Sequence, residues 1–220
     1  MHRAVHQTLE GGTIFADPYA LQILDDEARA NLPAMAADPA HRPMRLFIAA
    51  RSRFSEEAMA TCVARGVRQV VILGAGLDTF ALRNPHAGIT VYEIDYPATQ
   101  AWKRERLTQT GVALPPSLTF APIDFERQSL GKGLSASGFR ADEPAFFQWL
   151  GVTPYLTREA IVSTLDFVAS IAGSESYSST RSRLRTTRRP CAPILSQLPK
   201  ALPHAANLGS ACLILLTWPH

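Results

Sequence analysis

The run Val70-Val71-Ile72-Leu73 is followed directly by Gly74-Ala75-Gly76, and this junction limits the fold of the chain more than any other feature. A continuously apolar run of β-branched residues is typical of a strand buried on both faces, as in a parallel sheet. Glycine then lets the backbone turn sharply and approach another segment or a ligand closely. The sequence therefore predicts a buried strand over residues 67–73 that ends in a tight turn.

Further strands and helices alternate on both sides of this junction. Before it, Ser55-Glu56-Glu57 predicts the start of a helix, with Ser55 as its N-cap, that stops at Gly66. After it, we expect strands at 89–94, 118–123 and 145–150, and helices at 77–82, 97–109 and 157–173. This alternation predicts an α/β fold, a Rossmann-like, doubly wound and mostly parallel sheet.

Three regions of the chain differ in composition. Residues 1–50 are interrupted by four prolines, and we expect them to form an N-terminal helical cap, which is either a lid over a site or a cover for core surface. Residues 51–175 form the expected cofactor-binding core. Residues 176–220 contain six basic residues and no acidic one, whereas residues 1–175 contain 16 basic and 19 acidic residues. This change predicts a separate basic tail.

The basic tail lacks the pattern of a buried strand. Residues 176–189 are rich in Ser, Thr and Arg. We expect a solvated tail rather than a nucleic-acid site, because no aromatic residues are interleaved with the arginines. Our hypothesis is that the reading frame shifts just after Glu175, so that the C-terminal strands of the sheet are missing or replaced.

Several classes of protein are excluded by composition. No segment reaches the roughly 20 apolar residues that a membrane span needs, and the N-terminus lacks the pattern of a secretory signal, so we expect a cytoplasmic protein without membrane contact. Cys62, Cys191 and Cys212 are too far apart for a disulfide framework or a CxxC metal site. The six histidines show no metal-ligand spacing, so we expect no metal. Oligomeric state is not predicted.

An acidic residue follows the glycine turn at a spacing that has chemical meaning. Asp95 ends the second expected strand, nineteen residues after Gly76, where a carboxylate can accept hydrogen bonds from both hydroxyls of a ribose. Position 79 is Thr, so the third glycine of the dinucleotide fingerprint is missing. This favours an adenosyl ligand without phosphates over NAD. A tight strand-to-helix turn without a ligand is the alternative.

Five blocks of sequence, in order between about Asp17 and Gly173, resemble a known family. They are Ala50-Arg51-Ser52-Arg53-Phe54, Gln69 to Thr79, Glu93-Ile94-Asp95-Tyr96-Pro97, Asp124-Phe125-Glu126, and Trp149 to Thr157. The chain is similar to the bacterial S-adenosylmethionine-dependent methyltransferases related to leucine carboxyl methyltransferase and polyketide O-methyltransferases. The resemblance implies S-adenosyl-L-methionine as the cofactor.

The resemblance also implies roles for particular residues. Arg53 would pair with the methionine carboxylate, Gly74 and Gly76 would lie beneath the cofactor, Asp95 would hold the ribose, and Asp124 with Phe125 would contact the adenine. Two alternatives stay open, because Arg53 also fits a solvated charge beside a helix and Asp124 a turn cap. Asp78 fits a helix cap as well as a ligand contact. Leu150 stands where the family has an acid, so that contact is not carried over.

The expected reaction is methyl transfer to an oxygen of a small molecule. Tyr155 is a candidate for the acceptor pocket, with packing as its alternative role. We identify no catalytic base, which favours a carboxylate or an acidic hydroxyl as acceptor, because these need little or no deprotonation. Two other functions compete with an active O-methyltransferase: a truncated, inactive remnant of one, and a nucleotide-dependent oxidoreductase on a similar sheet.

Overall fold

A parallel six-stranded sheet forms the centre of the molecule. The computed structural model describes residues 1–180 and 213–217. The strands are β1 (Gln69–Leu73), β2 (Thr90–Asp95), β3 (Leu118–Pro122), β4 (Ala145–Leu150), β5 (Glu175–Thr180) and β6 (Leu213–Thr217). Their order is β3-β2-β1-β4-β5-β6, so the chain builds outward from β1 to β3 and then crosses back to β4. This confirms the predicted doubly wound α/β fold.

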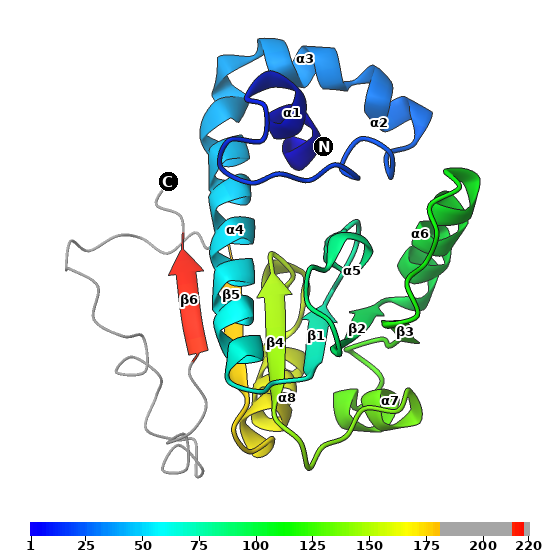
Figure 1. The fold of residues 1–220 in the computed structure, drawn as a ribbon, viewed down its shortest axis with the longest axis vertical. Helices are drawn as coiled ribbons and strands as arrows, with labels where there is room; N and C mark the ends of the chain where they lie inside the picture. Colours follow the sequence, from blue (N-terminus) through cyan, green and yellow to red (C-terminus); the bar gives the residue numbers. More distant parts are fainter. Residues whose placement is uncertain (181–212, 218–220) are drawn as a thin grey trace, which may run out of the picture.

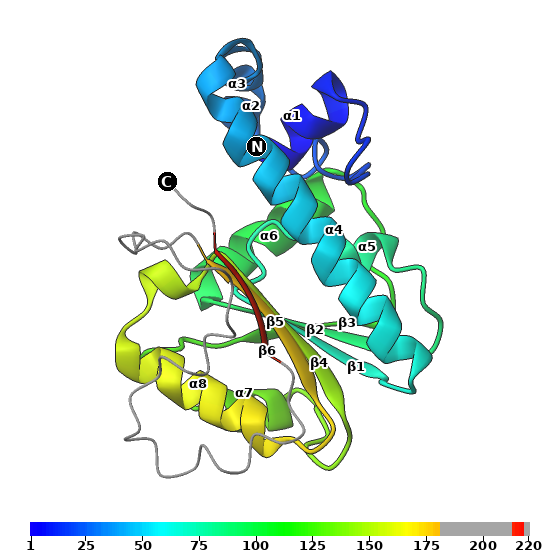
Figure 2. The ribbon, with the colours of Figure 1, turned by 90° about the vertical axis from the view of Figure 1, so that its left-hand side faces the viewer.

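Helices cover both faces of the sheet (Figure 2). One face carries α4 (Arg42–Ala64), α5 (Phe80–Arg83) and α6 (Pro97–Gln109), and the other carries α7 (Leu130–Ala136) and α8 (Arg158–Ser170). Successive strand residues point to opposite faces, so Val70 and Ile72 pack with Met59 of α4 while Val71 packs with Val168 of α8. Both faces of the central strands are therefore buried, as the apolar run predicts.

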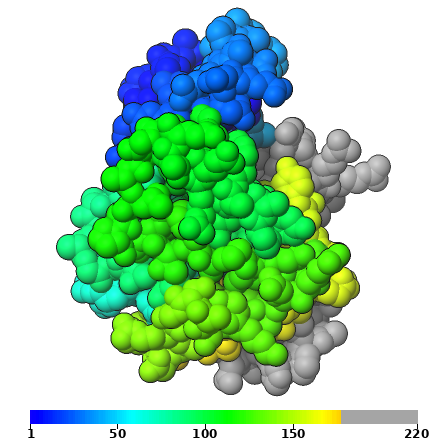
Figure 3. Space-filling model, turned by 90° about the vertical axis from the view of Figure 1, so that its right-hand side faces the viewer, coloured from blue at the N-terminus to red at the C-terminus, as the bar shows by residue number. Residues whose placement is uncertain are grey.

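The cap lies beyond the carboxyl ends of the strands (Figure 1). It consists of α1 (His2–Leu9), α2 (Asp26–Ala30), α3 (Leu32–Ala37) and the 3-10 turn η1 (Pro39–His41). In the space-filling view it rests on the surface formed by residues near 100 (Figure 3), where Arg106 donates to the Leu24 carbonyl at 2.6 Å.

Helix α4 corrects one sequence prediction. The helix runs without a break from Arg42 to Ala64, so the expected start at Ser55 is wrong. Pro43 occupies the first turn, where the missing N–H costs nothing. Ser55 lies inside the helix, and its hydroxyl donates to Gln148 Oε1 of β4 at 2.7 Å. One helix therefore joins the cap to the core across residue 50.

The described part of the C-terminal region also corrects an expectation. Residues 175–180 form β5, which pairs in parallel with β4 from Phe146–Glu175 to Leu150–Ser179. The sequence of residues 176–189 lacks the pattern of a buried strand, but its first residues do join the sheet, because backbone pairing with β4 does not require an apolar pattern. Strand β6 pairs with β5 in the same direction. Residues 181–212, with the arginine-rich run, lie outside the described residues. No helix within the described ranges is long and apolar enough to cross a membrane.

Candidate functional site

The glycine turn lies where the strand order reverses, at the carboxyl ends of β1 and β4. Gly74 has a φ of +64°, and a Cβ there would overlap the side chain of Val152, which follows β4. Gly76 has a φ of +48°, and a Cβ there would meet no atom of the described residues within 4 Å. The first glycine thus packs the two strand ends together, and the second leaves open space beside the turn. Ligands of open α/β sheets bind at such a crossover.

Asp95 lies against this turn, as the sequence predicts. Its Oδ2 accepts a hydrogen bond from the Gly76 N–H at 2.5 Å, and its Oδ1 accepts one from the Tyr96 N–H at 2.7 Å. The Asp95 carbonyl accepts from the Ile123 N–H at 2.9 Å, which brings the end of β3 to the same place. The carboxylate and the open side of the turn are therefore neighbours.

Asp124 and Phe125 follow β3 at the same edge of the sheet. The Asp124 carboxylate accepts from the Glu126 N–H at 3.0 Å, which is the turn-capping role left open by the sequence. The Phe125 ring stacks on Trp149, with centroids 6.5 Å apart and planes 23° from parallel. The indole N–H of Trp149 is buried without a hydrogen-bond partner in the described part of the chain. Sequence reasoning did not single out Trp149, although its position one residue before the end of β4 places it at the same edge of the sheet as the predicted site.

Arg53 and Arg51 point to different surroundings. Arg53 donates from Nε to Glu57 at 2.7 Å on the exposed face of α4, where both side chains are more than half accessible to solvent. Arg51 lies toward the sheet, and its Nη1 is 2.9 Å from where a Cβ on Gly151 would be. The structure therefore brings Arg51, rather than Arg53, to the end of β4 beside the glycine turn.

Tyr155 lies on the 3-10 turn η2 (Thr153–Tyr155) and is 85% exposed. Its backbone N–H donates to the Val152 carbonyl at 2.9 Å, but the ring is not enclosed by the described residues. Tyr155 therefore follows the end of β4 closely in sequence, but its ring does not line a pocket formed by the described residues.

Asp78 links the glycine turn to the cap. Its Oδ1 accepts from the Phe80 N–H at 2.8 Å, and its Oδ2 lies 3.3 Å from the guanidinium of Arg3. Burial alone would raise the pKa of Asp78, but the positive charges of Arg3, Lys103 and Arg83 outweigh burial and lower it below its ordinary value. Asp78 is therefore held as a carboxylate beside the turn.

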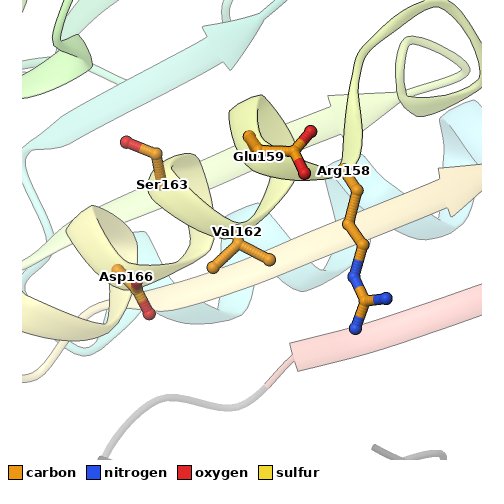
Figure 4. Close-up of a pocket in the computed structure, with 5 residues that line it drawn as sticks. All are labelled: Arg158, Glu159, Val162, Ser163 and Asp166. Carbon is orange, nitrogen blue, oxygen red and sulfur yellow. The ribbon is translucent and has the colours of Figure 1, made fainter. Parts of the chain in front are cut away.

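A separate cavity of about 470 Å³ lies over the outer face of α8. Figure 4 shows the described side chains that line it, which are Arg158, Glu159, Val162, Ser163 and Asp166. They follow one side of the helix, and none belongs to the glycine turn or the predicted cofactor residues. Within the described ranges, no group of three His, Cys, Asp or Glu residues is placed to hold a metal ion.

The comparisons with known proteins all match this chain to methyltransferases. The family model described as leucine carboxyl methyltransferase matches residues 1–169. A protein of Bacillus subtilis (strain 168), named putative S-adenosyl-L-methionine-dependent methyltransferase YktD, is 38% identical over 118 residues, which are 53% of this chain and 38% of that protein. A protein of Mycobacterium sp. (strain JLS), named putative S-adenosyl-L-methionine-dependent methyltransferase, is 36% identical over 163 residues, 71% of this chain and 60% of that one. The chain thus matches less than two thirds of the length of these relatives.

A solved O-methyltransferase family protein from Burkholderia thailandensis aligns with a TM-score of 0.38 and 18% identity, over 78% of this chain and 51% of that one. This likeness is too weak to add to the topology described above.

Proposed function

The chain belongs to the leucine carboxyl methyltransferase family, and from that premise we propose that it binds S-adenosyl-L-methionine and transfers the methyl group to an oxygen of a small molecule. The observation that carries the proposal is the contact between Asp95 and the N–H of Gly76. This contact supports the proposal, because it holds a carboxylate at the open side of the glycine turn, where ribose hydroxyls could donate to it.

The residues at the strand ends fit this cofactor. No atom of the described residues lies near a Gly76 Cβ, which leaves room for a ligand against the backbone. Phe125 is only partly buried and offers an aromatic ring at the end of β3, and Trp149 of β4, which is 3% exposed, supports that ring from inside the protein. Asp124 remains the proposed partner of the adenine amino group. When bound, the cofactor supplies a methyl group already activated by a sulfonium, so the chain's task is alignment.

We propose that Arg51 binds the methionine carboxylate, in place of Arg53, which the sequence predicts for this role. A guanidinium grips a carboxylate through two parallel hydrogen bonds and must therefore face the site. Arg51 lies against Gly151 at the end of β4, whereas Arg53 is engaged with Glu57 on the exposed face of α4.

The acceptor is proposed to be a carboxylate or an acidic hydroxyl. In the described part of the chain, the ionisable groups around the glycine turn and the residues that follow it are carboxylates, arginines and Lys103, which is paired with Glu93, and none is an obvious base at neutral pH. A carboxylate acceptor is already ionised near neutral pH and needs no proton removed. Alignment in a water-poor site is then sufficient.

An inactive remnant is the second candidate, favoured by the absence of acidic residues from 176–220. Resequencing the gene and translating the other two frames downstream of Glu175 tests it. A family-like pattern of strands in one of those frames supports a frame shift, and none in either frame contradicts it.

Isothermal titration of the full chain with S-adenosylhomocysteine tests the proposed function. We expect micromolar binding, a loss of about 100-fold in Asp95→Ala because two hydrogen bonds to a charged group are removed, and no change in the exposed control Asp142→Ala. Thermal unfolding verifies that each variant is folded. Folded wild-type protein that does not bind contradicts the proposal, and binding of reduced nicotinamide cofactor instead would favour an oxidoreductase.

The same titration separates the two arginines. Arg51→Gln is expected to weaken binding about tenfold or more, and Arg53→Gln less than twofold. Equal losses, or a larger loss in Arg53→Gln, would return the role to Arg53.

A further inference from the structure

The loop after the glycine turn, residues Leu77 to Thr79, is held by basic side chains from two distant segments. Arg3 of α1 donates from Nη2 to the Leu77 carbonyl at 2.5 Å and pairs with the Asp78 carboxylate at 3.3 Å. Lys103 of α6 donates to the Asp78 carbonyl at 2.6 Å. The first two carbonyls of this 77–79 loop therefore each accept a hydrogen bond from a cation.

Asp17 of the cap holds the third residue of the loop. Its side chain is fully buried, and its Oδ1 accepts from the hydroxyl of Thr79 at 2.8 Å. Its Oδ2 lies 3.4 Å from Arg3 Nε, and Arg83 of α5 approaches at 3.7 Å. The buried carboxylate therefore contacts two cations and a hydroxyl inside the protein.

The network continues into helix α4. Arg83 forms a two-pronged pair with Glu56, with distances of 2.7 and 2.5 Å, and stacks over the ring of Phe15 at 4.7 Å. Charges that leave water lose hydration, so they are tolerated only when their partners are placed accurately. A network with several such pairs therefore favours one position of the cap relative to the loop.

We propose that Arg3 and Asp17 are positioning residues of the cofactor site, which fix the 77–79 loop and through it the glycine turn. The Asp78 N–H donates to the Ala75 carbonyl at 2.7 Å, so the shape of the loop is transmitted to the residue between the two glycines. The inference rests on the proposed function, because it assigns the cap a part in cofactor binding rather than in covering core surface alone.

A matched pair of arginine variants tests the proposal. Arg45 of α4 is also buried, and it forms a two-pronged pair with Glu10 of the cap, but no contact joins it to the 77–79 loop among the described interactions. Arg3→Gln thus breaks the ion pairs with Asp17 and Asp78, and Arg45→Gln breaks the pair with Glu10. Titration with S-adenosylhomocysteine, well below both melting temperatures, compares their effects.

We expect both variants to melt earlier, but only Arg3→Gln to weaken binding, by about tenfold or more relative to Arg45→Gln. Arg3→Lys, which keeps the charge, should recover part of the affinity. Equal losses of affinity in Arg3→Gln and Arg45→Gln would overturn the proposal, since a purely structural role predicts them. Asp17→Asn serves as the second variant if Arg3→Gln does not fold, because the amide can still accept from Thr79.

Amide hydrogen exchange without any ligand separates this proposal from the proposed function. We expect exchange at residues 75–80 to be at least tenfold faster in Arg3→Gln than in Arg45→Gln. Wild-type protein that does not bind S-adenosylhomocysteine would contradict the proposed function, and this difference in exchange would still support positioning. Identical exchange in the two variants would overturn it.

Discussion

The strand core and the cap are held together by different forces. The core buries continuous apolar clusters on both faces of the sheet, with Val70, Val71 and Phe147 each at most 1% exposed. The cap has a small apolar cluster around Ala4 and Leu24 and docks to a large extent through ion pairs and hydrogen bonds of charged side chains. Burial of apolar surface is non-directional and insensitive to pH, whereas ion pairs depend on geometry and protonation. We therefore expect substitutions in the core to change stability and substitutions in the cap to change the site.

The largest effect is expected from Phe147→Ala in the core. Phe147 packs against the rings of Phe139 and Phe167 at 6.1 and 6.2 Å, so its removal leaves a cavity. The free energy of unfolding should fall by about 3–5 kcal/mol, measured by urea denaturation. Leu24→Ala in the small cap cluster should cost about 2 kcal/mol, at the lower end for such a change. A larger cost for Leu24→Ala would remove the contrast between the regions.

The two glycines of the turn allow a sharper comparison of stability with binding, because Gly74 packs against Val152 whereas Gly76 borders the open side of the turn. Alanine at either position has a strained positive φ, which costs roughly 1–2 kcal/mol. Gly74→Ala also creates a clash with the side chain of Val152. A change of the Val152 rotamer does not relieve this clash, because the Cβ of Val152 is itself only 3.1 Å from the new Cβ. Overpacking therefore raises the expected loss of stability to about 2–4 kcal/mol. Gly76→Ala should cost less stability and yet lower affinity for S-adenosylhomocysteine by about tenfold or more.

Urea denaturation and isothermal titration on both glycine variants measure this separation. The contrast fails if Gly76→Ala loses as much stability as Gly74→Ala, or if it binds like the wild type.

The core could be predicted from sequence because its signal is local. Strand β1 contains the uninterrupted apolar run Val70–Leu73, and β4 has the predicted bounds of 145–150. The network around the 77–79 loop joins residues 75 and 62 positions apart, and no local pattern links them. Strand β5 was also missed because its signal is not local: its residues have no apolar pattern, and only backbone pairing with β4 defines the strand.

Arg53 was predicted from the sequence and Arg51 was not considered, for a different reason. Residues two positions apart in a helix point about 200° apart, so a block that contains both arginines does not say which one faces the site. Which arginine faces the site depends on whether the helix includes these residues and on how α4 packs against the sheet. That start was misplaced at Ser55, and the structure puts it at Arg42.

The smallest predicted effect is a pH dependence that belongs to the cap. Burial, followed by the positive charges of the amino terminus, His41, Arg45 and Arg51, lowers the pKa of His2 to about 4 from an ordinary 6.5. As the pH falls from 6.5 toward 4, the unfolded chain binds a proton at His2 that the folded chain does not, so the folded state loses stability. Since His2 is only half-buried, we expect a loss on the order of 1 kcal/mol between pH 7 and 5.

Melting temperatures of the wild type and His2→Gln between pH 7 and 5 measure this loss. The substitution removes the titrating group, so the melting temperature of the variant should fall less than that of the wild type over this range. Burial raises the pKa of Glu56 and Glu93, and neighbouring positive charges lower that of Asp78, but these carboxyl groups are present in both proteins, so their effect cancels in the comparison. Parallel curves would mean that His2 is as accessible to protons in the folded chain as in the unfolded one. The cap would then be more loosely docked than its ion pairs indicate, which would also weaken the case that it positions the 77–79 loop.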